Sequence, residues 1–175
     1  MGTAIIYNPQ KVERVRLQEA VDLALARAGL RKGNYYPTTE QDQGGAQAKE
    51  ALADGHTLIL VAGGDGTVRS VAEAIAYTDA ELGLLPVGTG NVLARNLSIP
   101  LGSLGRAALK AAAGETHRID LARVTIDLGD HREPVVRTFA VMAGLGLDAK
   151  IIMNTDAQLK RTLGWVAYVE GGLRS

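Results

Sequence analysis

The chain has 175 residues, of which 46% are hydrophobic and 22% charged, and its 19 basic and 19 acidic residues leave no net charge. This composition is near the globular average, which excludes a collagen-like or disordered chain, and the balanced charge gives no whole-chain field that would attract nucleic acid. Cysteine is absent, which excludes disulfides, cysteine nucleophiles and thiolate metal sites and fits a reducing compartment.

The N-terminal segment carries no basic lead and only a short apolar run, so no signal peptide is expected. No stretch reaches the roughly 20 apolar residues that a membrane-spanning helix needs. We therefore expect a cytoplasmic protein, and any contact with lipid would have to be peripheral, at a membrane surface.

Strand-like and helix-like segments alternate from the first residues onward. An apolar run at 4–8 predicts a buried strand, and helical spacing of apolar residues in 11–30 predicts a helix capped by Gly29. The helical stripe comprises Val12, Val15, Ala20, Val21, Ala24, Leu25 and Ala28. The elements predicted next are a strand at 34–39, a helix at 44–55, a strand at 56–64, a helix at 67–78, a strand at 81–88, and helices at 89–97 and 102–114. This alternation is typical of βαβ units, so residues 1–117 are predicted to form an open α/β domain with a mostly parallel sheet.

The pattern changes after Gly114. Residues 116–146 hold two β-like runs around the polar segment 129–134, which predicts an antiparallel hairpin, and residues 148–175 read as helical. A two-stranded hairpin is marginally stable alone. Residues 118–175 are therefore expected to begin a β-rich second domain that these 175 residues do not complete.

A glycine-rich loop follows the most apolar of the predicted strands. It consists of Gly63, Gly64, Asp65, Gly66 and Thr67, with Thr67 as the expected N-cap of the next helix. Glycines allow backbone N–H groups to approach a phosphate, and the start of a helix supplies free donors. Because Asp65 would repel an anion, the loop implies Mg²⁺ together with a nucleotide, with Asp65 as an indirect metal contact. The alternative is an ordinary strand-to-helix turn capped by Asp65 or Thr67.

A second loop repeats this design after the next strand. It contains Gly88, Thr89, Gly90 and Asn91 and opens a short helix, within which Arg95 either reaches a phosphate or is a solvated charge. Asn8 and Pro9 end the first strand, and Thr38 and Thr39 end the second. The carboxyl ends of parallel strands form one rim, so these groups are predicted to line one nucleotide crevice, although Asn-Pro and Thr-Thr are also common in plain turns.

Other patterns are weaker candidates. Residues 144–149 satisfy a dinucleotide-binding fingerprint with Glu170 downstream, but too little chain follows for the rest of such a sheet. The three histidines show no metal-ligand spacing and are expected at the surface: His56, His117 and His131. Trp165 and Tyr168 are expected in a core or an interface.

Four segments, in this order and spacing, resemble the diacylglycerol kinase catalytic family: GGDGT at 63–67, PVGTGN at 86–91, RIDLARV at 118–124 and AGLGLDA at 143–149. That family includes sphingosine, ceramide and bacterial lipid kinases and is distantly related to NAD kinases and phosphofructokinases. The resemblance implies an α/β domain that binds ATP with Mg²⁺, a C-terminal β-sandwich, and phosphorylation of a lipid hydroxyl between them. By the same resemblance, Asn8, Thr39, residues 63–67, Thr89 and Asn91 would contact the nucleotide.

The sequence departs from the family pattern at several points. The first loop reads NPQKV and lacks the usual small residues, Arg69-Ser70 stands where Asn-Glu is usual, and Val141 replaces an asparagine. The family's acidic general base lies in a later Asp-Gly-Glu-type motif, which is absent here, so no catalytic residue is assigned and the base is expected beyond Ser175. We therefore expect this chain alone to be inactive as a kinase. The alternatives are an inactive nucleotide-binding module that forms homo-oligomers through exposed strands, and an NAD kinase-like phosphotransferase.

Overall fold

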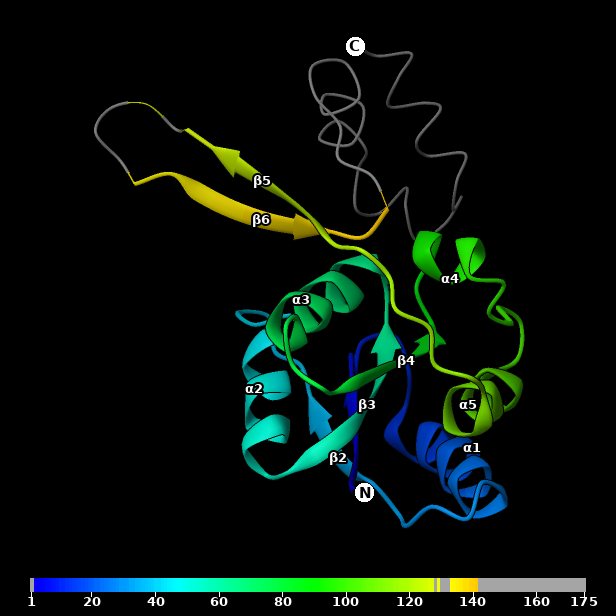
Figure 1. The fold of residues 1–175 in the computed structure, drawn as a ribbon. Helices are drawn as coiled ribbons and strands as arrows, with labels where there is room; N and C mark the ends of the chain where they lie inside the picture. Colours follow the sequence, from blue (N-terminus) through cyan, green and yellow to red (C-terminus); the bar gives the residue numbers. More distant parts are fainter. Residues whose placement is uncertain (1, 128, 130–132, 142–175) are drawn as a thin grey trace. The chain divides into compact units, whose positions relative to one another are not determined.

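The computed structural model describes residues 2–127, 129 and 133–141, and all the elements below belong to one compact unit, Met1–Ala140. Four parallel strands form its sheet in the order β2-β1-β3-β4 (Figure 1). They are β1 (Gly2–Tyr7), β2 (Asn34–Pro37), β3 (His56–Gly63) and β4 (Glu81–Pro86). The predicted fold class, an open α/β domain around a parallel sheet, is confirmed.

Helices cover both faces of this sheet. They are α1 (Arg14–Arg27), α2 (Gly45–Ala53), α3 (Asp65–Ile75), α4 (Val92–Asn96) and α5 (Leu104–Ala113). Because successive strand residues point to opposite faces, Ile5 packs on the side of α1 and α5, while its neighbour Ile6 packs on the side of α2 and α3 (Figure 1). The two central strands are therefore buried on both faces, as expected of a parallel sheet between helical layers.

The apolar stripe of α1 differs in phase from the prediction. The buried side chains of α1 are Leu17, Val21, Ala24 and Leu25, whereas Val15 is 69% exposed. Val15 lies two residues from Leu17, which is about 200° around the helix and therefore on the opposite face. The prediction that Val15 faces the core is wrong.

The predicted cap at Gly29 is confirmed. Gly29 has φ +71°, its N–H donates to the Ala26 carbonyl, and the N–H of Leu30 donates to the Leu25 carbonyl. This is a Schellman motif, in which a left-handed glycine lets the chain satisfy the last carbonyls of the helix.

His56 does not lie in a surface loop. It begins β3, and neither of its buried ring nitrogens has a hydrogen-bond partner among the described residues. Its ring meets that of Tyr36 edge-on, with 6.0 Å between the ring centroids. His56 is therefore half-buried and not freely exposed as predicted, because β3 starts directly after the Gly55 turn and takes His56 into the sheet.

The predicted hairpin is present. β5 (Ala122–Ile126) pairs antiparallel with β6 (Val135–Phe139), so that Arg123 lies opposite Thr138. A small antiparallel sheet thus begins after α5, as predicted, whereas the domain boundary after residue 117 stays a prediction. The fingerprint at 144–149 with Glu170 and the helical segment predicted at 148–175 lie outside the described residues. The same holds for His131, Trp165 and Tyr168.

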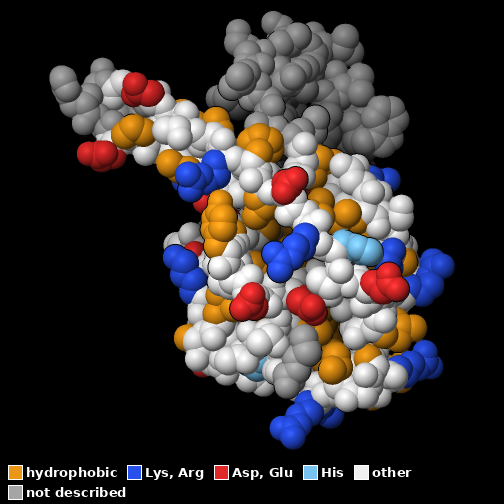
Figure 2. Space-filling view, viewed as in Figure 1, with side chains coloured by type: hydrophobic (Ala, Val, Ile, Leu, Met, Phe, Trp, Pro, Cys, Tyr) orange, Lys and Arg blue, Asp and Glu red, His pale blue; other side chains and the backbone are white. Residues whose placement is uncertain are grey.

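Charged side chains are mixed on the surface. On the face shown in Figure 2, Lys and Arg side chains are interspersed with Asp and Glu side chains, so no patch of one sign dominates the described part of it. None of the described helices has the length and apolar character of a membrane span.

Candidate functional site

The predicted site residues gather at one edge of the sheet. Because all four strands are parallel, their carboxyl ends meet there, and hydrogen bonds continue the ladder past the strand ends. The N–H of Thr38 donates to the Tyr7 carbonyl at 2.8 Å, and the N–H of Asn8 donates to the Ala62 carbonyl at 2.9 Å. The N–H of Val87 donates to the Gly63 carbonyl at 3.3 Å. The four strand ends therefore form one continuous rim.

The first glycine loop is shorter than predicted because α3 begins at Asp65. Gly64 is the N-cap, and no side chain caps this helix. Thr67 is buried in the first turn, so the prediction that it is the N-cap is wrong. Its side chain lies over Gly63 instead, where a Cβ would come within 2.5 Å of the Thr67 Cβ.

The first turn of α3 has three N–H groups that no side chain among the described residues caps. The N–H groups of Asp65, Gly66 and Thr67 precede the first intrahelical bond, in which the Val68 N–H donates to the Gly64 carbonyl. With no side-chain cap, these three donors and the helix dipole suit an anionic oxygen.

The second glycine loop is closed by Asn91. This residue adopts a left-handed conformation with φ +49° and is nearly buried. Its Nδ2 donates to the Gly88 carbonyl at 2.7 Å, and its Oδ1 accepts from the Gly88 N–H at 3.1 Å. Both polar ends of the side chain therefore hold the loop, while Thr89 between them is exposed. A direct contact of Asn91 with a nucleotide stays a prediction.

Asp65 and Arg95 connect this loop to its surroundings. The Asp65 Oδ1 accepts from the Val92 N–H at 2.6 Å, across 27 residues of sequence. Arg95, in α4, donates from Nε to the Gly90 carbonyl at 2.8 Å. The second loop is thus held by Asp65 of α3, by its own Asn91 and by Arg95 of α4.

A third segment, residues 39–44, lies against the first loop. Asp42 accepts from the N–H groups of Gly44 at 2.8 Å and Ala46 at 3.1 Å, and so caps α2. Gly44 has φ +124°, and a Cβ there would approach Val71 of α3 to 2.9 Å. Sequence reasoning missed Asp42, although an aspartate within the few residues before a predicted helix is a recognisable capping signal.

Asn8 and Thr39 act in local turns. The Asn8 Oδ1 accepts from the Gln10 N–H at 2.9 Å, and the Thr39 Oγ1 accepts from the Asp42 N–H at 3.0 Å. Pro9 and Thr39 are exposed, and Thr38 is buried. Their places on the rim agree with the sequence prediction, and their contacts with a nucleotide stay predictions.

A separate groove of about 710 Å³ runs along the outer edge of β2. Its wall includes Arg14, Asp22, Tyr35, Glu50 and Asp54, and none of the predicted site residues line it. The Tyr35 and Tyr36 hydroxyls donate there to Asp22 at 3.1 Å and to Asp54 at 2.6 Å. We place the candidate site at the glycine loops, because the predicted site residues lie there beside the uncapped start of α3, and none of them lines this groove.

Residues 3–124 match the family model of the diacylglycerol kinase catalytic domain. The chain belongs to this diacylglycerol kinase catalytic family. A probable lipid kinase YegS-like of Xanthomonas campestris pv. campestris is 35% identical to it, over 97% of this chain and 54% of the relative. One of the same name from Pseudomonas fluorescens is 40% identical, over 71% of this chain and 38% of the relative. The chain thus spans about half the length, or less, of these curated relatives.

Solved structures of diacylglycerol kinases share the fold. A putative diacylglycerol kinase from Bacillus anthracis str. Sterne superposes with a TM-score of 0.67 at 25% identity, over 97% of this chain and 53% of that chain. A second structure from the same organism gives a TM-score of 0.59 at 24% identity, over 71% of this chain and 47% of that chain. Family and fold therefore agree with the resemblance seen in the four sequence motifs.

Membership of this kinase family makes a nucleotide-bound divalent metal relevant. Among the described residues, no group of three or more acidic or histidine side chains is placed to hold a metal ion. In the two glycine loops, Asp65 is the one acidic residue, and one of its oxygens is bonded to Val92. Mg²⁺ in nucleotide sites is held mostly by phosphates and water with one or two carboxylates, so the site fits a metal that arrives with the nucleotide.

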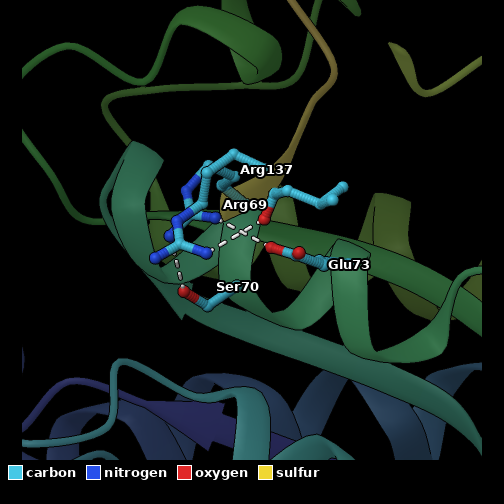
Figure 3. A network of polar contacts seen from close by, with 5 residues as sticks. Arg69, Ser70, Glu73 and Arg137 are labelled. Atoms are coloured by element: carbon cyan, nitrogen blue, oxygen red, sulfur yellow. Dashed lines mark hydrogen bonds and ion pairs between the residues drawn. The ribbon is translucent and has the colours of Figure 1, made fainter. Parts of the chain in front are cut away.

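The family departure at Arg69 is accommodated along α3. Its Nη1 lies 2.9 Å from the Glu73 Oε2, and its Nη2 is 3.3 Å from the Ser70 Oγ (Figure 3). Arg137 of β6 appears in the same view and donates from Nη1 to the Val136 carbonyl at 2.9 Å. The positive charge of Arg69 is therefore paired on its own helix and is not used in the glycine loops.

Proposed function

We propose that this chain binds ATP with Mg²⁺ at its two glycine loops and serves the ATP-dependent phosphorylation of a lipid hydroxyl of the diacylglycerol type. One observation carries the nucleotide part of the proposal. The glycine loops of β3 and β4, which are adjacent parallel strands, meet backbone to backbone at Gly64 and Gly88, beside three uncapped N–H groups of α3. Such a surface presents donors to phosphate oxygens at close range.

Phosphoryl transfer depends mainly on the positioning of the reacting groups and on stabilisation of the charge in the transition state. Phosphoryl transfer has a loose transition state with charge spread over the phosphoryl oxygens, so aligned donors contribute more than covalent chemistry. The N–H groups of Asp65, Gly66 and Thr67 would hold phosphate oxygens, and the rim from Asn8 to Thr39 would border the rest of the nucleotide. When bound, Mg²⁺ would neutralise phosphate charge, and it would be held mainly by phosphate oxygens and water, with Asp65 as an indirect contact through water.

The acceptor is proposed from the family. The relatives are named probable lipid kinases, and the solved neighbours are diacylglycerol kinases. We therefore propose that the acceptor is a lipid at a membrane surface and that the protein acts from the cytoplasm in phospholipid metabolism. We also propose that the hairpin β5–β6 is the start of a second domain. No residue of the chain is assigned as the base that deprotonates the lipid hydroxyl.

Calorimetric titration with ATP, in the presence of Mg²⁺, tests the nucleotide part. We expect saturable binding by the chain and its loss in Gly66→Glu, because the new carboxylate would face phosphate at the start of α3. Gly105→Glu is the matched control, since Gly105 is exposed in the first turn of α5 and a Cβ there would meet no atom within 4 Å. Absence of binding by a chain that circular dichroism shows to be folded would contradict the proposal.

Transfer assays test the acceptor. A full-length relative, given labelled ATP, diacylglycerol vesicles and NAD together, is expected to label the lipid. Label in NAD would favour the NAD kinase-like alternative, and label in neither would remove the lipid kinase assignment.

A further inference from the structure

We propose that Asp65 is a positioning residue, whose carboxylate locks the second glycine loop to the first and is not a direct ligand of the metal. The consequence for ATP affinity rests on the proposed function. The lock itself is a property of the nucleotide-free chain and does not depend on that function.

The lock begins with a cap that α4 lacks locally. Asn91 is the N-cap of α4, but its side chain is bonded to Gly88 and caps nothing in the helix. The N–H of Val92, the first residue of α4, donates instead to the Asp65 Oδ1 at 2.6 Å. A short bond from an amide to a carboxylate is among the stronger hydrogen bonds in proteins. Because the Asn91 side chain is used to close the second loop, Asp65 of α3 caps α4 in its place.

The second oxygen of Asp65 faces the same loop. A Cβ on Gly90 would lie 2.7 Å from the Asp65 Oδ2, so the carboxylate as a whole is turned toward Gly90 and Val92. The partial positive charge at the start of α4 offsets its negative charge. This explains how a carboxylate is tolerated on Asp65, the first of the three residues whose N–H groups the proposed phosphate would use.

Glycines make this approach possible. Gly64 precedes Asp65, and its backbone lies against that of Gly88, so the two loops approach closely enough for the carboxylate to span them. With the lock in place, the donors of α3 and the turn at Gly88 keep one relative geometry before any ligand arrives. Pre-arranged donors bind with less loss of conformational entropy.

Two substitutions separate a positioning role from a metal-ligand role. Asp65→Asn keeps an acceptor oxygen in the position of Oδ1 but removes the charge, whereas Asp65→Ala removes both. If Asp65 acts through Val92, the asparagine variant retains most of the function. If Asp65 binds the metal directly, both variants lose the metal-dependent part of ATP binding.

The first measurement is hydrogen exchange of the Val92 amide by NMR, on the nucleotide-free chain. We expect exchange to accelerate about tenfold in Asp65→Ala and to stay within about threefold of wild type in Asp65→Asn, in line with the loss of one hydrogen bond. Asp79→Asn, at an exposed carboxylate outside both loops, is the control for charge and should leave Val92 unchanged. Wild-type protection of Val92 in Asp65→Ala would overturn the lock, whether or not the chain binds ATP.

The second measurement is the ATP dissociation constant with Mg²⁺ and with EDTA. We expect Asp65→Ala to weaken binding by a similar factor in both solutions, and Asp65→Asn to keep the wild-type ratio of the two constants. If the dissociation constants of Asp65→Asn with EDTA and with Mg²⁺ became equal, Asp65 would be a metal ligand and the proposal would be overturned. Because Asp65→Asn gives this result alone, the test stands even if Asp65→Ala does not fold.

Discussion

Gly64 and Gly88 face each other backbone to backbone: a Cβ built on Gly88 would lie 2.5 Å from the Gly64 Cα and 2.9 Å from the Asn91 Oδ1. From the other side, a Cβ on Gly64 would keep 3.6 Å from the Gly88 Cα, which is ordinary contact. Glycine is therefore required by space at 88 but not at 64. The close approach of the two loops depends on the second glycine of the pair.

Gly88→Ala is expected to push the loops apart. The neighbouring atoms belong to the backbone and to a side chain held by two bonds, so they cannot yield cheaply, and overpacking of this kind costs about 1–3 kcal/mol. Urea unfolding should show the lower stability, and ATP titration a weaker affinity. The matched substitution Gly105→Ala, in the exposed first turn of α5, should instead stabilise the chain by up to about 1 kcal/mol. Equal effects of the two substitutions would contradict the contact.

Asn91→Ala is expected to destabilise the second loop more than Asn91→Gly. Both variants lose the two bonds with Gly88, but alanine must also adopt the left-handed backbone that glycine accepts freely. We expect losses of about 2–3 kcal/mol for alanine, and about 1 kcal/mol less for glycine. Denaturant midpoints at constant slope provide the comparison. If glycine were the more damaging, the left-handed conformation would not matter here.

Alkaline pH is expected to destabilise the fold partly through Tyr36. Burial, and next the hydrogen bond to Asp54, raise the pKa of Tyr36 from 10.0 to about 12. Because the unfolded chain releases this proton first, the free energy of unfolding falls as the pH rises from about 10 to about 12. Tyr36→Phe should flatten the fall, while Tyr77→Phe, at a side chain that is 94% exposed, should not. Burial beside Asp22 also raises the pKa of Tyr35, which extends the effect in the same direction.

Arg69→Ala is expected to leave ATP binding within about twofold of wild type, because the guanidinium is paired with Glu73 on the same helix. The pair is partly exposed, so its loss should cost no more than about 0.5 kcal/mol of stability. Thermal unfolding and ATP titration measure the two quantities. A large loss of affinity would show that Arg69 leaves Glu73 to contact the phosphates.

The sheet was more predictable from the sequence than the details of its loops. Alternation of strands and helices was sufficient for the parallel topology, and that topology alone brings Asn8, Thr38, Gly63 and Gly88 to one edge. The stripe predicted for α1 misplaced Val15 because it left out Leu17, which is buried and points about 200° away from Val15 around the helix. The error at Thr67 has a different cause: the extended Gly64 is the N-cap, so α3 starts at Asp65, two residues before Thr67.

The bond between Asp65 and Val92 could not be predicted from either motif alone. It spans 27 residues and depends on how closely two glycine backbones approach, which is a tertiary property. The capping bonds of Asp42 are local, by contrast, and a search for capping residues before each predicted helix would find them. Local rules identified the residue types of the site, and packing decided what each side chain bonds.

The bridge from Asp65 to Val92 also limits how this fold can be engineered. A protein designer who grafts the first loop onto another sheet would leave its carboxylate without the amide it now serves, and the second loop grafted alone would lose its cap. The two loops therefore form one structural unit, although most of α3 and the whole of β4 lie between them in the chain. Transplantation should succeed only when both loops and the glycine contact between them move together.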